Sequence, residues 1–306
     1  MENLEISKLF SVKGLVAVIT GGGSGIGRMM AHALAANGAS KVFIIGRREE
    51  RLQETAASAP SGSIIPVVGD VTSSESLQAA YSFVASQTDH VDLLVANSGT
   101  TGRPYKSSEP RPDGSLPSFS ELRDFLWSMS MEDFTNVAHV NVTGAFYTIL
   151  AFLPMLEAAN RKRSASDQST ISPPRPQIII TSSVAGFSRF VPTTENIAYH
   201  LSKAAVNHMV KLLATNLVQD NIRVNGIAPG LYYTDMTSSF YKSQGVEGKG
   251  LVDGSFSRDI IPITRGGGEG DMAGVILYMA GAAGGYLNGS IIVGDGGSLC
   301  LFPSTY

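Results

Sequence analysis

Short runs of apolar, β-branched residues alternate along the chain with longer segments of helical character. The first run, Leu15–Ile19, is entirely apolar and ends at Thr20 and three glycines. Runs of the same kind predict further strands at 41–45, 64–68, 91–96, 178–181, 223–228 and 290–293. The intervening segments predict helices at 28–37, 47–57, 73–87, 131–159, 198–219 and 269–280.

The apolar runs are continuous and not alternating, which is typical of strands buried on both faces of a sheet. Strands of this kind that alternate with helices predict an α/β fold: one doubly wound (Rossmann) domain over residues 1–306, with about seven parallel strands and helices on both faces. Two proline-containing segments, 100–120 and 161–177, interrupt the rhythm. Because the alternation resumes after each, we expect both to be loop insertions and not domain linkers.

Composition narrows the class of protein. Only 16% of residues are charged and the net charge is −3, so there is no overall positive field to attract nucleic acid or anionic lipid. The single cysteine, Cys300, cannot form an internal disulfide. No secretory signal or uninterrupted apolar span is evident, and the histidines lack metal-binding spacing. These features predict a soluble cytoplasmic protein with no metal, nucleic-acid or membrane partner.

A glycine-rich turn lies between the first predicted strand and the first predicted helix. It comprises Gly21, Gly22, Gly23, Ser24, Gly25, Ile26 and Gly27. Glycines let a backbone turn sharply and approach a pyrophosphate, and the following helix offers unpaired N–H groups to that anion. The spacing TGxxxGxG differs from GxGxxG, and a flexible turn would look alike, but the position after a buried strand favours a dinucleotide site.

The second predicted strand ends at two arginines. Dinucleotide-binding folds usually place an acid about 20 residues beyond the glycine turn for a ribose hydroxyl, whereas an arginine there suits a 2′-phosphate. Arg47 and Arg48 occupy this place, which favours NADPH over NADH. The alternative is that both arginines only flank a solvated helix start.

Tyr199 and Lys203 are four positions apart in a predicted helix and so project from one face. A free tyrosine has a pKa of about 10, and a neighbouring ammonium lowers it towards neutral pH. His200 is expected to point elsewhere on the helix. Alone, YxxxK is an unspecific pattern, but here it follows the serines of Thr181–Gly186, which close a buried strand at its carboxyl end.

Taken together, the motifs resemble the short-chain dehydrogenase/reductase family, in its single-domain, NADP-preferring branch. The matching motifs, in the family's order, are T20-G-x-x-x-G25-I-G27, D70-V71, N97-S-G99, N141, S183-V-A-G186, Y199-x-x-x-K203, P229-G230 and D295-G-G297. The resemblance implies that Tyr199 is the general acid, that Lys203 tunes it and holds the nicotinamide ribose, and that Ser183 binds the substrate oxygen. It further implies that Asn141 anchors a proton-relay water.

The same resemblance implies the remaining cofactor contacts. Asp70 and Val71 would contact the adenine, Asn97 would steady the central strand and the cofactor, and Ile227, Pro229, Gly230 and Thr234 would lie at the nicotinamide side. Two departures stand out. Tyr199 follows Ser183 by about three residues more than the family's habit, which leaves Ser182 as a competing assignment, and Asn141 stands further from Asn97 than is usual, which leaves it open as an ordinary helix residue.

Residues 232–263 connect a strand to a late helix and, by the resemblance, cover the substrate. Their aromatic residues and glycines predict a mobile lid that suits a bulky apolar ketone. We therefore expect an NADPH-dependent carbonyl reductase acting on an apolar or polyketide-like substrate, in secondary metabolism, and a homo-oligomer (tetramer or dimer). The alternatives are a non-redox cyclase or dehydratase with NADP as a structural element, and a redox-silent NADP-binding protein.

Overall fold

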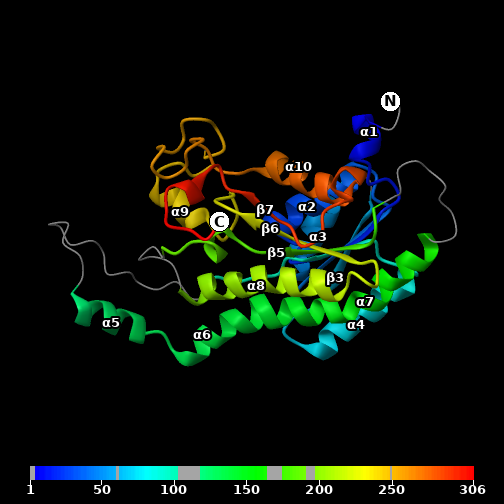
Figure 1. Cartoon of the computed structure of the whole chain (residues 1–306), viewed down its shortest axis with the longest axis horizontal. Helices are drawn as coiled ribbons and strands as arrows, with labels where there is room; N and C mark the ends of the chain where they lie inside the picture. The colour runs from blue at the N-terminus through cyan, green and yellow to red at the C-terminus, as the bar shows by residue number, and fades with distance from the viewer. Residues whose placement is uncertain (1–3, 60–61, 103–117, 164–173, 191–196, 249) are drawn as a thin grey trace.

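The computed structural model describes residues 4–59, 62–102, 118–163, 174–190, 197–248 and 250–306. They form a seven-stranded parallel sheet of order β3-β2-β1-β4-β5-β6-β7, which confirms the predicted doubly wound α/β fold (Figure 1). The strands are β1 (Val16–Thr20), β2 (Lys41–Gly46), β3 (Ile64–Val68), β4 (Leu93–Ala96), β5 (Gln177–Thr181), β6 (Arg223–Pro229) and β7 (Ile291–Gly294).

The strand order reverses beside β1, which pairs with β2 on one side and with β4 on the other. In such sheets the loops that leave the carboxyl ends of the two strands diverge to opposite faces and open a crevice for ligands. The fold therefore places the glycine-rich turn after β1 and the residues after β4 at the same crevice.

Alternate residues of β1 enter different hydrophobic cores. Ala17 and Ile19 pack with Leu34 and Ile276, from α2 (Gly25–Ala36) and α10 (Glu269–Ala280), on one face. Val16 and Val18 pack on the other face with α4 (Ser74–Gln87), α7 (Gly144–Arg163) and α8 (Ile197–Asn216). The remaining helices are α1 (Ile6–Leu9), α3 (Glu49–Ala57), α5 (Phe119–Trp127), α6 (Met131–Ala138) and α9 (Ser238–Ser243) (Figure 1).

The helix predicted at 131–159 is present without a break, but its hydrogen-bonding pattern changes in the middle. A π-helical turn, His139–Thr143, separates α6 from α7, which runs on to Arg163. Such turns recur at functional sites, and this one holds Asn141. The two predicted insertions lie largely outside the described residues (103–117 and 164–173).

Residues 131–163 are, by length and mean hydropathy alone, apolar enough to cross a membrane, although they contain no uninterrupted apolar run of that length. In the fold, 44% of the most apolar stretch of this segment is buried. Ile149, Phe152 and Leu156 are fully buried in the core beneath the sheet. This stretch is therefore a core helix of the α/β fold.

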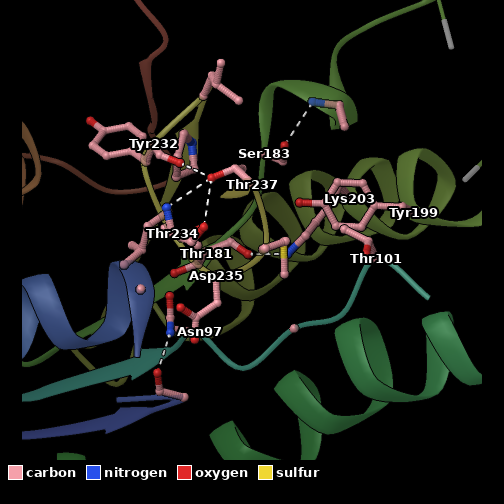
Figure 2. A pocket seen from close by; sticks show the side chains of 18 of the residues that line it. Asn97, Thr101, Thr181, Ser183, Tyr199, Lys203, Tyr232, Thr234, Asp235 and Thr237 are labelled. Atoms are coloured by element: carbon pink, nitrogen blue, oxygen red, sulfur yellow. Dashed lines mark hydrogen bonds between the residues drawn. The ribbon is translucent and has the colours of Figure 1, made fainter. Parts of the chain in front are cut away.

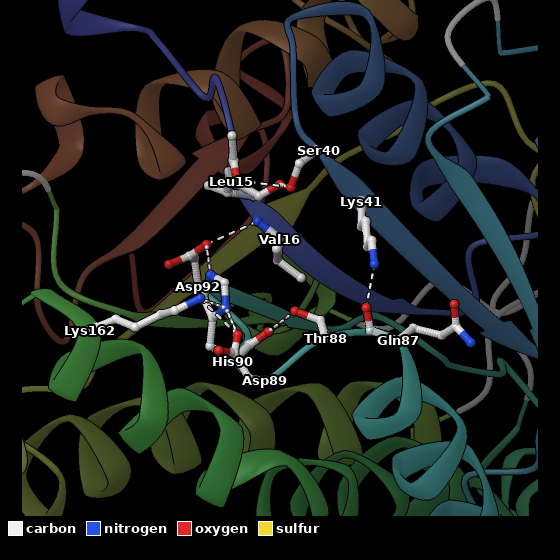
Figure 3. A network of polar contacts seen from close by, with 11 residues as sticks. Leu15, Val16, Ser40, Lys41, Gln87, Thr88, Asp89, His90, Asp92 and Lys162 are labelled. Atoms are coloured by element: carbon white, nitrogen blue, oxygen red, sulfur yellow. Dashed lines mark hydrogen bonds and ion pairs between the residues drawn. The ribbon is translucent and has the colours of Figure 1, made fainter.

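A polar network lies at the amino-terminal ends of the strands, where β1 and β4 begin (Figure 3). The carboxylate of Asp92 accepts a hydrogen bond from the Val16 N–H at 2.9 Å. Lys162, at the end of α7, donates to Asp89 at 2.8 Å, and His90 lies 2.7 Å from the same carboxylate. These hydrogen bonds, that of Lys162 first, lower the pKa of Asp89 to about 2. The network ties α7 to the sheet on the side away from the crevice.

Candidate active site

A cavity of about 1000 Å³ opens at the carboxyl ends of the strands. Figure 2 shows Ser183 after β5, Tyr199 and Lys203 on α8, and Asn97 after β4 around it. It brings together most of the predicted site residues: Gly21, Ser24, Gly25, Ile26, Arg47, Arg48, Asp70, Val71, Asn97, Ser183, Tyr199, Lys203, Pro229, Gly230 and Thr234. Gly27, Asn141 and Ile227 do not line it. Ile227 is buried in the core, because it lies within β6 and not beyond its end.

The glycine-rich turn needs its glycines for two separate reasons. Gly21 and Gly25 have φ of +68° and +52°, a region that L side chains rarely adopt. At Gly27 the reason is close approach, because a Cβ there would lie 2.3 Å from the Gly21 carbonyl oxygen. Ser24, the N-cap residue of α2, makes no side-chain hydrogen bond to the helix. The turn and the helix start thus offer a bare backbone cradle that fits a pyrophosphate.

Asn97 joins the two strands that border the crevice. Its backbone N–H donates to the Thr20 hydroxyl at 3.0 Å, and its side-chain amide donates to the Thr20 carbonyl at 3.0 Å. A Cβ at Gly21 would lie 2.9 Å from the same amide nitrogen. Asn97 therefore fixes the distance between the end of β4 and the glycine-rich turn.

The arginines border the end of the cavity nearest to β2. Arg48 donates to the Ser24 hydroxyl at 3.1 Å, and Arg47 lies 4.0 Å from the Asp70 carboxylate, with 74% of its side chain exposed. Burial raises the pKa of Asp70, but hydrogen bonds from Thr72 and the charge of Arg47 hold it below its ordinary value. Arg51, which the sequence did not single out, also lines this end. Three guanidinium groups here fit an additional phosphate.

Tyr199 and Lys203 lie one turn apart on α8, as the helical spacing predicts. The Lys203 ammonium is 5.6 Å from the centroid of the Tyr199 ring and donates to the Thr181 carbonyl at 2.8 Å. Burial lowers the pKa of Lys203 to about 8. His200 also lines the cavity, contrary to the expectation that it points elsewhere.

The two candidate serines differ in their partners. Ser182 donates to the Asn207 amide oxygen at 2.5 Å and lies 3.2 Å from the Lys203 carbonyl, so its hydroxyl is committed to α8. Ser183 accepts from the Ala185 N–H at 3.2 Å, which leaves its own proton for a ligand in the cavity. The hydrogen bonds favour Ser183, and the longer loop before Tyr199 includes 191–196, outside the described residues.

Asn141 lies behind the cavity wall and is 2% exposed. Its amide nitrogen donates to the Thr100 carbonyl and to the Ser202 hydroxyl, both at 2.9 Å, and its oxygen accepts from the Thr100 N–H at 2.8 Å. Asn141 is therefore more than an ordinary helix residue: it joins the loop after β4 to α8. Both side-chain donors are engaged, so only its oxygen has a lone pair left for a water.

The segment predicted as a lid contains its own small core. Tyr241 is fully buried and makes edge-on ring contacts with Phe256 and Tyr233. A Cβ at Gly250 or Gly266 would lie 2.2 Å and 1.8 Å from atoms of the Tyr241 side chain. Gly250 of this segment and Gly266, three residues beyond its end, thus serve close packing. The cavity side is formed by other residues, including Met236 and Phe240.

The C-terminal residues were not anticipated at the site. Ser298, Leu299 and Phe302 line the cavity, next to Phe190 from the loop after Ser183. The only signal nearby is the D295-G-G297 motif, which ends the last strand but says nothing about the direction of the tail.

Comparisons with known proteins agree with this geometry. Residues 15–245 match the family model for short chain dehydrogenases. The chain is 43% identical over 307 residues to the short-chain dehydrogenase/reductase PhomF of Diaporthe leptostromiformis, covering 99% of this chain and 98% of that protein. It is 39% identical to the short-chain dehydrogenase/reductase VdtF of Byssochlamys spectabilis, over 99% and 98% of the two chains.

Among solved structures, the chain resembles the Pseudomonas aeruginosa RhlG/NADP active-site complex, with a TM-score of 0.74, 32% identity, and coverage of 94% of this chain and 98% of the other. The parallel sheet, the glycine-rich turn and the Tyr199–Lys203 pair are consistent with a dinucleotide-dependent oxidoreductase. The chain belongs to the short-chain dehydrogenase/reductase family, whose members are NAD(P)-dependent oxidoreductases.

Proposed function

We propose that this enzyme is an NADPH-dependent carbonyl reductase acting on a bulky apolar ketone. One observation carries the proposal: Ser183, Tyr199 and Lys203 line the same cavity as the glycine-rich turn and Arg47. A dinucleotide that extends from the turn along the carboxyl ends of the strands would bring its far end to α8.

The bound cofactor supplies a hydride to the carbonyl carbon. The Tyr199 hydroxyl donates its proton to the carbonyl oxygen, so that the ketone becomes a secondary alcohol and a phenolate remains. Ser183, whose proton has no acceptor among the described residues, donates a hydrogen bond to the same oxygen and holds it near Tyr199.

Lys203 stabilises the phenolate by its charge. Its ammonium is fixed by the Thr181 carbonyl, and its pKa of about 8 keeps it largely protonated at neutral pH. In a buried site such a charge acts at low effective dielectric and so strongly favours the ionised phenol. Asn141 holds the loop after β4 in place behind this pair, and its free lone pair is the point at which a relay water would bind.

The preference for NADPH rests on Arg47 and Arg48, with Arg51 beside them. No acid follows β2 directly, and guanidinium groups suit a 2′-phosphate. The similar RhlG structure is described as an NADP complex. NADPH should raise the melting temperature more than NADH at equal concentration, and Arg47→Asp should narrow or reverse that gap. If the difference between the two melting-temperature shifts is unchanged in Arg47→Asp, Arg47 does not determine the preference for NADPH.

The substrate preference rests on the apolar wall of the cavity. Met236, Phe240, Ile260 and Phe302 line the cavity together with Tyr199. Apolar linings with few polar groups suit large neutral ligands.

Homo-oligomer formation is supported by apolar side chains on the outer faces of two helices. Tyr147 and Leu150 of α7 and Leu201 and Leu212 of α8 are 42–53% exposed. Exposed apolar residues that gather on adjacent helices are typical of subunit contacts. Light scattering coupled to size exclusion would give a dimer or tetramer mass, and a monomer would contradict this part of the proposal.

The function is tested by following NADPH oxidation with a panel of bulky ketones. The wild-type enzyme should oxidise NADPH only when a ketone is present, and Tyr199→Phe should lower kcat by at least about 100-fold, because general acid catalysis contributes about 10²–10⁴. Cofactor binding without oxidation, with product formation that ignores Tyr199→Phe, would instead favour non-redox chemistry. Binding without any product would favour a redox-silent protein.

A further inference from the structure

The C-terminal residues 298–306 lie along the loop that follows Ser183. Arg189 donates its backbone N–H to the Pro303 carbonyl at 2.8 Å, and Thr305 donates its N–H to the Phe187 carbonyl at 2.9 Å. Ser188 and Ser304 form an antiparallel bridge between these two segments. The tail is therefore paired, backbone to backbone, with the segment 187–190 that begins four residues after Ser183. Figure 1 shows the C-terminus beside α9.

Aromatic contacts strengthen this pairing. The rings of Phe190 and Phe302 are stacked, with centroids 5.6 Å apart and planes 9° from parallel. Phe187 and Tyr306 meet edge-on at 5.3 Å. Of these four rings, only Phe190 and Phe302 line the cavity. The stacked pair forms part of the cavity wall, and the second pair supports it from behind.

The direction of the tail is fixed where β7 ends. Gly296 and Gly297 have φ of +63° and +85°, which turns the chain sharply. The Asp295 carboxylate then accepts hydrogen bonds from the N–H groups of Gly297 and Leu299, at 2.9 and 2.8 Å. The same sharp turn presents Leu299 and Phe302 to the cavity.

The charge of this wall is also distinctive. The same cavity is lined by the apolar side chains of Met236, Phe240 and Ile261 and by two acidic residues, Asp235 and Asp259. Within the described part of the lining, the arginines are Arg47, Arg48 and Arg51, which follow the end of β2. These two carboxylates in the lining disfavour an anionic substrate that does not reach the arginines near β2.

We propose that the tail Ser298–Tyr306 is a specificity wall, in which Phe302 stacked on Phe190 forms an aromatic subsite for an uncharged ketone that carries a flat fused ring. A flat ring packs against aromatic faces and edges, and it is held more tightly than an aliphatic chain of equal size. The inference deepens the proposed function and rests on it for the reaction, but not for the binding.

The first measurement compares steady-state reduction of three probes: 2-acetylnaphthalene, the anion 6-acetyl-2-naphthoate, and cyclohexanone. Phe302→Ala should raise KM for 2-acetylnaphthalene about five- to tenfold, with kcat within twofold, since an aromatic contact corresponds to roughly this factor. For cyclohexanone, the KM of Phe302→Ala should differ less than twofold from that of the wild type. Phe302→Tyr should restore the wild-type KM for 2-acetylnaphthalene. The wild-type enzyme should use the naphthoate at least tenfold less efficiently.

The matched control is Leu301→Ala. Leu301 is adjacent and similarly exposed (39% against 36% for Phe302), but it does not line the cavity. Leu301→Ala should leave KM and kcat for all three probes unchanged. If Phe302→Ala does not fold, as judged by circular dichroism and NADPH binding, Phe302→Leu removes the ring while keeping an apolar volume.

The second measurement is independent of turnover: calorimetric titration of 2-acetylnaphthalene into the protein saturated with NADP⁺. Weaker binding in Phe302→Ala but not in Leu301→Ala supports the wall even if no ketone is reduced, in which case the proposed function alone fails. Equal binding in both variants, or none to the wild-type protein, overturns the wall even where reduction is normal. A naphthoate that is used as well as the neutral ketone overturns the selection against charge.

Discussion

Lys203 is only 4% exposed, and burial of its charge therefore lowers the stability of the fold at neutral pH. We predict that Lys203→Met, which removes the ammonium and keeps an apolar chain of similar length, changes the dependence of stability on pH as well as the activity. The variant loses the hydrogen bond to the Thr181 carbonyl at every pH, which contributes a constant term. The part of the stability difference that depends on pH comes from the protonation of Lys203.

The size of that term follows from the pKa of Lys203, which burial lowers from 10.5 to about 8. Between these values the unfolded chain binds a proton that the folded chain does not, so stability rises with pH across this window. The gain is absent below pH 8, where both states are protonated, and complete above 10.5. Since one pKa unit corresponds to about 1.4 kcal/mol, wild-type protein should gain about 2 to 3 kcal/mol over Lys203→Met between pH 7 and pH 10.

The assay is urea unfolding followed by circular dichroism at several pH values and one protein concentration, without cofactor. Other groups titrate in the same range, but they cancel in the difference between wild type and variant. Lys211→Met is the control, because Lys211 lies on the same helix, is exposed, and bonds the Gly289 carbonyl. A difference between wild type and Lys203→Met that stays constant from pH 7 to pH 10 would refute the reasoning.

Three further outcomes follow. Gly27→Ala places a Cβ 2.3 Å from the Gly21 carbonyl oxygen, so we expect NADPH affinity to fall at least tenfold by calorimetric titration, and retained affinity would contradict the cradle. Gly266→Ala places a Cβ 1.8 Å from the Tyr241 hydroxyl and should lower the free energy of unfolding by about 1–3 kcal/mol. Adding Tyr241→Phe should recover part of that loss, and a purely additive double variant would contradict the contact. Finally, kcat/KM for ketone reduction should decline above pH 8, as Lys203 loses its charge, whereas a flat profile to pH 10 would separate that charge from catalysis.

Those parts of the fold that depend on buried apolar runs were predictable. Strands such as Val16–Thr20 and Gln177–Thr181 are buried on both faces, and the continuous runs located them within one or two residues. Helix boundaries were less accurate. Helix α2 begins at Gly25, three residues before the predicted start, because the glycine-rich turn itself provides the first helical turn.

Two elements were not predicted, because neither shows as a pattern of buried apolar residues. Helix α5, Phe119–Trp127, has no buried residues and was not predicted as a helix. The π-helical turn at His139–Thr143 leaves no mark in the apolar periodicity, because it inserts only a local change of hydrogen bonding into a continuous helix.

For the site, short-range motifs gave the residues but not the three-dimensional partners. The Tyr199–Lys203 pair follows from helical geometry, and the glycine-rich turn follows from backbone freedom. The hydrogen bonds of Asn141 to Thr100 and Ser202 span 41 and 61 positions, and no pattern in the sequence encodes them. The tail at Phe302 lacked a signal for the same reason, since its direction is set by the turn at Asp295.

The central claim is that Tyr199 protonates a carbonyl while a hydride arrives from a dinucleotide bound beside it. The most direct measurement uses NADPH that carries deuterium at its hydride-donating carbon, with product analysed by mass spectrometry and NMR. The account predicts one deuterium on the carbinol carbon of the wild-type product, and at least about 100-fold less product from Tyr199→Phe at undiminished NADPH affinity. Product without deuterium, or full turnover by Tyr199→Phe, would contradict it.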